Sequence, residues 1–372
     1  MSSGTMAFAG MGDAFLYPVL PVYGQGMGVS AFAIGVLLSV NRLVRIVANT
    51  YVANLVARFG TKHMLVVSSF IAVATTVFYG LNLGLVVFFV ARVLWGLCYS
   101  GLKIATLNYA TSIKGRRGLA FAVSQSTKSM GALLVLSVGP MLVKQTGIEH
   151  GFYFIATISV IGLVLALCLP KEEVGQPKAE VKAKNVFYPS SLNMLVFTTS
   201  IVVDGILVVG LALLLGSQQM SNSELLALVA IYLLGKKLLA GLISLLAGVL
   251  SLYMGTLRLY TLSIVCIIVG LLLIAANVLT IGILMVFLFN AIVVTFSPLV
   301  AIEGKVNKSN PLQAISGVST WWDLGAALGA FAGVYLIEMM SPGYLFLSLS
   351  LVILSLFINF IKQNGSPDTR II

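Results

Sequence analysis

Residues 84–112 read GLVVFFVARVLWGLCYSGLKIATLNYATS, an apolar run that contains only two charged residues. About 20 apolar residues are enough for a helix to cross a lipid bilayer, so this run predicts a membrane-spanning helix. Residues three or four positions apart share one face of a helix, and one face here would carry Arg92, Gly96, Tyr99 and Lys103. An ionisable group at the bilayer centre costs about 2.5–3.5 kcal/mol on insertion scales. This face should therefore meet a polar cavity or other charged residues instead of lipid.

The whole chain shares this composition. Of its 372 residues, 59% are hydrophobic and 9% are charged, unlike any soluble globular domain. Runs of spanning length predict twelve transmembrane helices, at 4–24, 31–57, 62–81, 84–112, 118–144, 150–170, 190–216, 223–252, 256–277, 280–303, 311–338 and 343–362. The sequence therefore predicts an all-α integral membrane protein.

Positive charge is distributed unevenly around these helices. Fourteen of the 22 Lys and Arg residues fall in loops or tails on one side, whereas Lys144 alone lies on the other side. Basic loops are typical of the cytoplasmic side, so we expect both termini there, in a multi-pass protein of the inner (plasma) membrane. The net charge of +11 thus indicates contact with the lipid bilayer and no contact with nucleic acid.

The longest hydrophilic stretch, KEEVGQPKAEVKAKNVFY from residue 171, predicts a cytoplasmic linker over 171–189. It separates an N-terminal six-helix bundle, 1–170, from a C-terminal six-helix bundle with a short cytoplasmic tail, 190–372. Polar positions of the two bundles match at shifts of 191 to 195 residues: Asp13 with Asp204, Lys128 with Trp322, and Arg42 with Lys237. These matches predict two pseudo-symmetric bundles from a duplicated unit.

The loop between the second and third predicted helices reads ANLVARFGTKH at 53–63. It resembles the loop of the major facilitator superfamily, whose usual pattern is G-x-x-x-D-R-x-G-R-R/K. Arg58, Gly60 and Lys62 match this pattern, whereas Ala57 stands where the family has an acid. The resemblance implies that the family's charge latch between its second and eleventh helices is weaker in this chain.

Two further motifs resemble that family. Arg92 and Gly96 fit its R-x-x-x-G pattern, and Gly139 with Pro140 is similar to the core of the antiporter motif of its exporters. The resemblance covers essentially the whole length and implies that these motif residues act in a conformational change. It also implies a monomeric secondary transporter without cofactors, whose two halves rock about a central site for a small-molecule substrate and protons.

The predicted spans hold seven bases but only three acids. A cavity with this surplus is positive, so its solute should carry negative charge. We expect an organic anion or zwitterion, such as a carboxylate-bearing metabolite, a siderophore-like chelator or a drug. The residues expected to bind it are Arg42, Arg45, Arg92, Tyr99, Gln125, Lys128, Lys237, Asn290 and Trp322.

The same bases also have a purely structural interpretation. Arg42 and Arg92 can pair with the acids and hold the bundle together, and Lys103 can extend toward the membrane surface. Lys236 and Lys237 are neighbours, so they point about 100° apart on a helix. The repeat favours Lys237 as the cavity residue and a local pair for Lys236.

Three carboxylates inside predicted spans are candidates for proton coupling: Asp13, Asp204 and Asp323. Asp13 and Asp204 occupy the middle of the first helix of each half, which lines the cavity in the family that the chain resembles. Arg42 and Lys237 would hold these two ionised until an anionic substrate weakens that hold. The alternative is that the acids form permanent salt bridges.

The chain lacks the common motifs of enzymes: it has no H-E-x-x-H, G-x-S-x-G or G-x-x-x-x-G-K-[ST] sequence. Its two His and three Cys residues lack metal-ligand spacing, so we expect no metal site. Transport would then be passive or driven by a gradient. We expect proton-coupled efflux by alternating access, and proton-coupled import of the same solutes is the alternative. A membrane receptor or a lipid scramblase is the alternative from another class.

Overall fold

The computed structural model describes residues 1–23, 31–113, 115–170, 181–216, 222–304 and 310–364. These residues form helices and the turns between them, and no strand occurs among them. The all-α fold class that the composition predicts is therefore confirmed.

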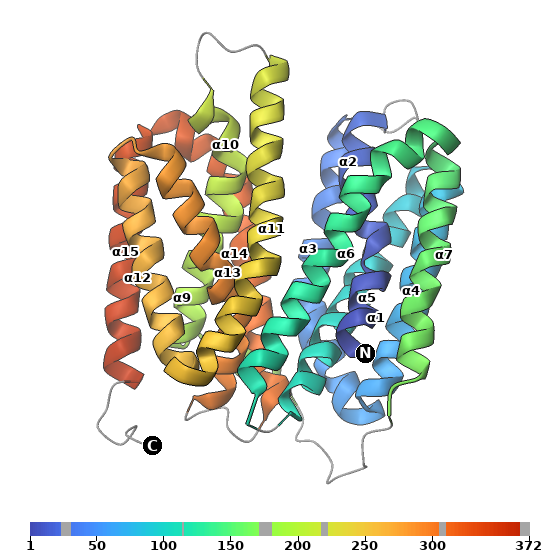
Figure 1. Ribbon diagram of the computed structural model, residues 1–372, viewed down its shortest axis with the longest axis horizontal. Coiled ribbons are helices and arrows are strands. Elements are labelled where there is room, and N and C mark those ends of the chain that lie inside the picture. Colours follow the sequence, from blue (N-terminus) through green and yellow to red (C-terminus); the bar gives the residue numbers. More distant parts are fainter. Residues whose placement is uncertain (24–30, 114, 171–180, 217–221, 305–309, 365–372) are drawn as a thin grey trace.

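The helices before the linker are α1 (Ser2–Ala9), α2 (Met11–Tyr23), α3 (Ala31–Phe59), α4 (Thr61–Gly80), α5 (Leu85–Thr111), α6 (Arg117–Thr146) and α7 (Ile148–Leu167) (Figure 1). Single glycines make two of the turns between them, with φ +86° at Gly60 and +83° at Gly147. Residues with a Cβ avoid this region of backbone conformation. Gly60 of the loop motif thus lets α4 start directly after α3.

The helices after the linker are α8 (Ala183–Val186), α9 (Ser191–Ser200), the π-helix η1 (Ile201–Leu207), α10 (Val208–Leu215), α11 (Asn222–Met254), α12 (Thr256–Ala275), α13 (Leu279–Glu303), α14 (Pro311–Met339) and α15 (Pro342–Asn364). Gly255 takes φ +78° in the turn from α11 to α12. It stands 195 residues after Gly60, in the equivalent turn. The two turns thus share one backbone conformation, and the duplication of the whole bundle stays a prediction.

Within the described ranges, nine helical stretches are long and apolar enough to cross a membrane by length and composition. The predicted spans 4–24, 31–57 and 311–338 are not among them. The first is divided at Gly10 into α1 and α2, and the other two are α3 and α14, which carry polar and charged side chains in their middle. The count of twelve therefore stays a prediction.

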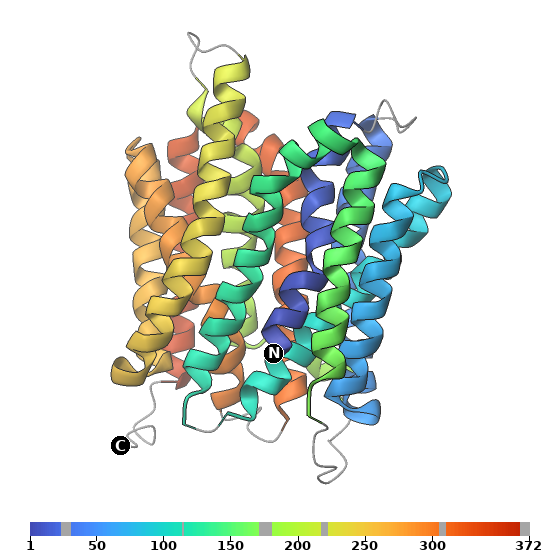
Figure 2. The ribbon, with the colours of Figure 1, turned by 45° about the vertical axis from the view of Figure 1, so that its right-hand side comes forward.

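The helices gather into two groups that touch along a limited surface. In Figure 1, α1–α7 lie on the right and α9–α15 on the left; we call them the N-terminal half and the C-terminal half. The halves meet where α3 packs against α14 and α6 against α11. Figure 2 shows α6 and α11 side by side. Residues at this contact therefore lie between the halves.

The α6–α11 contact joins the first part of α6 to the last part of α11. A Cβ on Gly118 would meet the Ser251 side chain, and one on Gly248 would meet Ala122. These positions lie near the start of α6 and the end of α11, beside the loops that are rich in Lys and Arg. We call this end of the bundle the basic end. The two halves are thus in contact at the basic end.

The described part of the linker is bound to both halves at the basic end. The Asn54 side chain of α3 donates to the Val181 carbonyl oxygen at 2.9 Å and accepts from its amide nitrogen at 2.7 Å. Trp321 of α14 donates from its indole nitrogen to the Val186 carbonyl oxygen at 3.0 Å. Val181 and Val186 are themselves buried. The linker is therefore anchored to the bundle at Val181 and Val186, whereas residues 182–185 between them are exposed.

Candidate functional site

Asp13 of α2 forms an ion pair with Arg92 of α5. The Arg92 side chain is completely buried, and its Nε also donates to the Leu37 carbonyl oxygen at 2.8 Å. All three residues belong to the N-terminal half. A buried guanidinium needs such partners because an uncompensated charge away from water is costly. This pair stays within one half of the molecule.

Asp204 lies in η1, and its partners are in the C-terminal half. One carboxylate oxygen pairs with Lys236 of α11, and the other accepts from the Trp322 indole nitrogen at 2.8 Å. The Lys236 Nζ also lies 5.1 Å from the centroid of the Phe287 ring. Short π-helical turns inside longer helices are frequent at functional sites. Here the π-turn carries the acid.

Asp323 of α14 joins the two halves. It pairs with Arg45 of α3 at 2.9 Å and accepts a hydrogen bond from Asn49 of α3 at 3.2 Å. The Arg45 and Asp323 side chains are 12% and 6% exposed, so water weakens this pair little. Of the three acid–base pairs described, this one crosses between the halves.

Tyr99 of α5 is a shared aromatic platform for two cations. The Arg45 guanidinium carbon lies 4.7 Å and the Lys128 Nζ 5.2 Å from the centroid of its ring. Cations at this range are attracted to the face of an aromatic ring. Lys103, one turn after Tyr99, feels the charges of Asp323 and Lys128. Tyr99 therefore links the polar faces of α3, α5 and α6.

Four bases form no ion pair with an acid of the described chain: Arg42, Lys103, Lys128 and Lys237. The charge of Arg42 acts on Asp204 across the halves. Lys237 is exposed, and the charges that act on it include Lys128 and Lys236. We call these four bases, the three acid–base pairs, Asn49, Tyr99 and Trp322 the central site.

Two ion-pair partners differ from those expected from the sequence. Asp13 pairs with Arg92 and not with Arg42, and Asp204 pairs with Lys236 and not with Lys237. Neighbouring residues point about 100° apart on a helix, and the face of α11 that is turned toward Asp204 presents Lys236. The repeat fixes a position along the helix but not the rotation of the helix about its axis.

The remaining substrate-binding candidates have different surroundings. Arg92 has no exposed surface for a solute in this conformation. Gln125 is half-buried on α6. Asn290 of α13 is 3% exposed, and its side-chain oxygen Oδ1 has no hydrogen-bond partner in the part of the chain that is described. The role of these three residues in binding stays a prediction.

Two of the predicted motif glycines let helices approach closely. A Cβ on Gly96 of α5 would come within 2.9 Å of the Asn41 carbonyl oxygen on α3, and one on Gly139 of α6 would come within 2.9 Å of the Phe15 ring. The Pro140 side chain lies outside the described part of the structure. The glycines thus serve helix packing, and their part in a conformational change stays a prediction.

The other motif residues lie at the basic end. Arg58 is exposed, with its guanidinium carbon 5.3 Å from the centroid of the Phe59 ring, and Lys62 is half-buried. Ala57 offers no carboxylate here. One turn earlier, Asn54 binds the backbone of the linker. The end of α3 therefore contacts the linker through an amide, one turn before the position where Ala57 replaces the acid of the loop pattern that it resembles.

Three residues in or beside the central site are not among the predicted binding residues: Asn49, Lys236 and Phe287. Asn49 follows Arg45 by four residues, and this spacing places it on the same polar face of the helix. Lys236 was expected to pair locally, without a named role. Phe287 lies in the long apolar run of α13, where nothing in the sequence distinguishes it from a lipid-facing residue.

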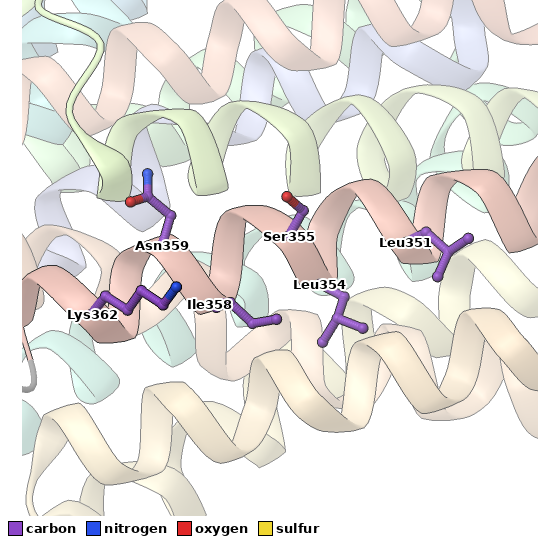
Figure 3. A pocket seen from close by; sticks show the side chains of 6 residues that line it. All are labelled: Leu351, Leu354, Ser355, Ile358, Asn359 and Lys362. Carbon is purple, nitrogen blue, oxygen red and sulfur yellow. The ribbon is translucent and has the colours of Figure 1, made fainter.

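A surface pocket of about 420 Å³ lies on α15. Its lining residues all belong to this one helix: Leu351, Leu354, Ser355, Ile358, Asn359 and Lys362 (Figure 3). It shares no residue with the central site. The described residues also contain no group of three or more His, Cys, Asp or Glu side chains that could hold a metal ion.

Apolar helices of spanning length that surround a charged interior define a class of protein. Ionisable residues in membrane spans face other helices or a polar pathway, and they are functional more often than not. The fold and the central site together are those of a polytopic membrane transport protein.

The sequence model of the Major Facilitator Superfamily matches residues 3–203, more than half of the chain. The protein belongs to the Major Facilitator Superfamily, as the loop and helix motifs implied. It is thus a multi-pass membrane protein of a superfamily of transporters.

Its curated relatives are distant. Multidrug resistance protein 2 of Bacillus subtilis is 22% identical over 175 residues, which are 47% of this chain and 43% of the relative. Multidrug resistance protein MdtG of Serratia proteamaculans is 26% identical over 186 residues, 48% of this chain and 45% of the relative. The chain thus covers less than half the length of the curated relatives that it matches.

Solved structures of the superfamily superpose over nearly the full length. The human organic anion transporter MFSD10 (TETRAN) gives a TM-score of 0.73 at 14% identity, covering 96% of this chain and 97% of that one. The transporter FucP in the outward conformation gives 0.75 at 13% identity, with 96% of both chains covered. At these identities the likeness shows the fold alone.

Proposed function

We propose that this transporter moves a small organic anion or zwitterion across the membrane by alternating access, with protons as the coupling ion and efflux as the direction. The observation that carries the proposal is the surplus of bases in the central site. After each acid has taken one base, four remain without an ion pair in the described chain: Arg42, Lys103, Lys128 and Lys237.

This surplus favours a role in binding over a role in holding helices together. A base that only stabilises the bundle is expected to have fixed partners, as Arg92 has in Asp13 and the Leu37 carbonyl. Positive charges away from bulk water are costly until a counter-charge arrives. An anionic solute supplies that charge. One structural neighbour, MFSD10, is itself described as an organic anion transporter, which agrees with the proposal.

For proton coupling we favour Asp323 over the other two acids. Asp13 and Asp204 pair with bases of their own half, so those pairs can persist while the halves move as rigid bodies. Asp323 must leave Arg45 and Asn49 when α3 and α14 separate. Protonation of the Asp323 carboxylate removes the negative charge that attracts Arg45, so a proton there lowers the free-energy cost of separating the halves.

Efflux rests on two lesser observations. The relatives from Bacillus subtilis and Serratia proteamaculans are both described as multidrug resistance proteins. Gly139 and Pro140 resemble the core of the antiporter motif. Efflux by exchange for protons requires that proton and solute move in opposite directions, whereas import by symport requires the same direction, so the sign of the driving gradient distinguishes them.

The experiment is uptake into proteoliposomes that contain the purified protein, with a pH gradient imposed in either direction. The probes are a radiolabelled organic anion and its uncharged amide analogue. We expect accumulation of the anion when the lumen is acidic, and little of the amide. Lys128→Gln should reduce uptake of the anion, whereas Lys144→Gln, outside the central site, should not.

Equal uptake of anion and amide, or an anion flux that ignores the pH gradient, would overturn the proposal. Accumulation of the anion with an acidic exterior would still support an anionic substrate and proton coupling, but it would change the proposed direction from efflux to import. Movement of labelled lipid between leaflets without any solute flux would instead support a scramblase.

A further inference from the structure

Two of the four surplus bases lie near one contact between the two halves. Lys128 lies on α6 and Lys237 on α11, the helices that form one of the contacts between the halves. A Cβ on Gly241, one turn after Lys237, would lie 3.6 Å from the Ser129 side chain, and Ser129 directly follows Lys128. The two helices run in opposite directions here, so Lys237 lies about 7 Å farther from the basic end than Lys128.

The electrostatic surroundings of Lys237 agree with this placement. The strongest charge acting on it is that of Lys128, followed by that of Lys236, whose own charge is taken up by Asp204. Like charges repel, and the repulsion grows as water is excluded from the space between them. The Lys128–Lys237 pair thus opposes contact of the halves until negative charge lies between the two ammonium groups.

Both side chains can reach such a charge. Lys237 is exposed and Lys128 is half-buried above the Tyr99 ring. Lysine is a compact charge with three donors on a flexible stem, so a pair of lysines binds separate anionic groups without a fixed geometry between them. A single arginine, in contrast, holds one planar group such as a carboxylate through two parallel hydrogen bonds.

The charge balance of the central site indicates how many negative groups the solute brings. Four bases have no ion pair with an acid in the described ranges, so a solute with one negative charge leaves three unbalanced. Such a solute would also neutralise the lysine of one half only, and the repulsion between Lys128 and Lys237 would remain largely in place. A second negative group lets each half hold one group of the same solute.

We propose that the solute carries at least two negative charges, as a dicarboxylate or an organic phosphate does, and that Lys128 and Lys237 bind it between the two halves. The proposal rests on the proposed function, because it assumes that the central site carries an anion. Beyond the proposed function, it specifies the number of negative charges on that anion and the two residues that recognise them.

The test measures the binding of small anions to the purified protein, and the fluorescence of its tryptophans reports the binding. Matched probes differ only in charge: succinate, butyrate and succinamide on an aliphatic scaffold, and phthalate, benzoate and phthalamide on an aromatic one. Inorganic phosphate serves as a compact anion. We expect each dianion to bind at least about ten-fold tighter than its monoanion, since one more charged hydrogen-bonding group is engaged.

Variants separate valence from general attraction. Lys128→Gln and Lys237→Gln should each lower the affinity for dianions to about that for monoanions, and change the affinity for monoanions much less. Lys144→Gln is the control for net charge, and a thermal melt of each variant verifies that it is folded. If a glutamine variant is unfolded, Lys→Met at the same position replaces it and should likewise lower the affinity for dianions to about that for monoanions.

Equal affinity for monoanions and dianions in the wild type would overturn this inference and leave the proposed function in place. So would variants that weaken both classes of anion by the same factor. Failure of every anion to bind, on both scaffolds and as phosphate, would contradict the proposed function as well.

Discussion

At the scale of single residues, the three acids of the central site differ in what they connect. Asp13 and Asp204 each pair with a base of their own half, whereas Asp323 pairs with Arg45 across the halves. Breaking a buried pair by removing one partner leaves a charge without compensation. Removal of the carboxylate should therefore cost stability at each acid, and at Asp323 it should also affect coupling.

We expect Asp323→Asn to uncouple transport. Asparagine can still accept a hydrogen bond from Arg45, but it cannot take up a proton. Exchange of labelled for unlabelled anion across the vesicle membrane should persist, because the surplus of positive charge only grows. Accumulation driven by a pH gradient should be lost. Both are measured in the same proteoliposomes, and accumulation that survives would exclude Asp323 as the proton carrier.

Asp13→Asn should act mainly on stability. It leaves the completely buried Arg92 without a counter-charge, which costs about 3–5 kcal/mol for a buried pair. A thermal melt in detergent measures the loss. The double variant Asp13→Leu with Arg92→Met should regain much of it, because no charge is then buried. A melting temperature of Asp13→Asn equal to that of the wild type would contradict this account of the pair.

At the scale of helices, the seam between α14 and the α9–η1–α10 segment brings backbone against backbone. Cβ atoms on Gly325 and Gly329 of α14 would collide with the carbonyl oxygens of Phe197 and Ile201, and one on Gly333 would come within 2.9 Å of the Ile206 Cα. Small residues at this spacing let two membrane helices approach closely. The contact positions Asp204 beside Trp322.

Gly329→Ala should therefore destabilise the protein by about 1–3 kcal/mol, because the neighbouring backbone cannot move aside as a side chain can. The matched control is Gly235→Ala on α11, where a Cβ would meet nothing within 4 Å. Alanine there should be neutral or stabilise by up to about 1 kcal/mol through helix propensity. Equal thermal melts of the two variants would contradict the packing argument.

The linker is the second element with a testable role. Asn54 of α3 and Trp321 of α14 both bind its backbone, at Val181 and Val186. Asn54→Ala removes two hydrogen bonds worth about 0.5–1.5 kcal/mol each. We expect faster cleavage by trypsin at Lys182 in this variant, and Trp321→Phe, which keeps the ring, should have a smaller effect. Unchanged cleavage in Asn54→Ala would show that the linker is held elsewhere.

The sequence predicts this architecture better than it predicts the contacts. Apolar runs and the repeat indicate an all-α membrane protein with an interior rich in bases, because burial in lipid leaves few alternatives. They do not indicate that Lys236, and not Lys237, meets Asp204, since helix rotation depends on packing against other helices. Neither the π-turn at Ile201–Leu207 nor the docking of Val181 on Asn54 has a pattern in the sequence.

At the scale of the whole molecule, two halves meet at the basic end, and a surplus of positive charge lies between them. Two pairs of charged residues act between the halves in opposite ways. The Arg45–Asp323 pair attracts the halves to each other, and the Lys128–Lys237 pair repels them. A proton weakens the attraction and an anion removes the repulsion. Proton and anion thus change the contact between the halves in opposite senses, as the two ligands of an exchanger should.

The most direct measurement is proton movement that accompanies solute movement, with no pH gradient imposed. Proteoliposomes hold a pH-sensitive dye, and a dianionic probe is added outside. The account predicts that uptake of the probe by the wild type makes protons leave the lumen, and that Asp323→Asn takes up the probe without moving protons. Uptake by the wild type with no change in luminal pH, or proton movement that is the same in Asp323→Asn, would contradict it.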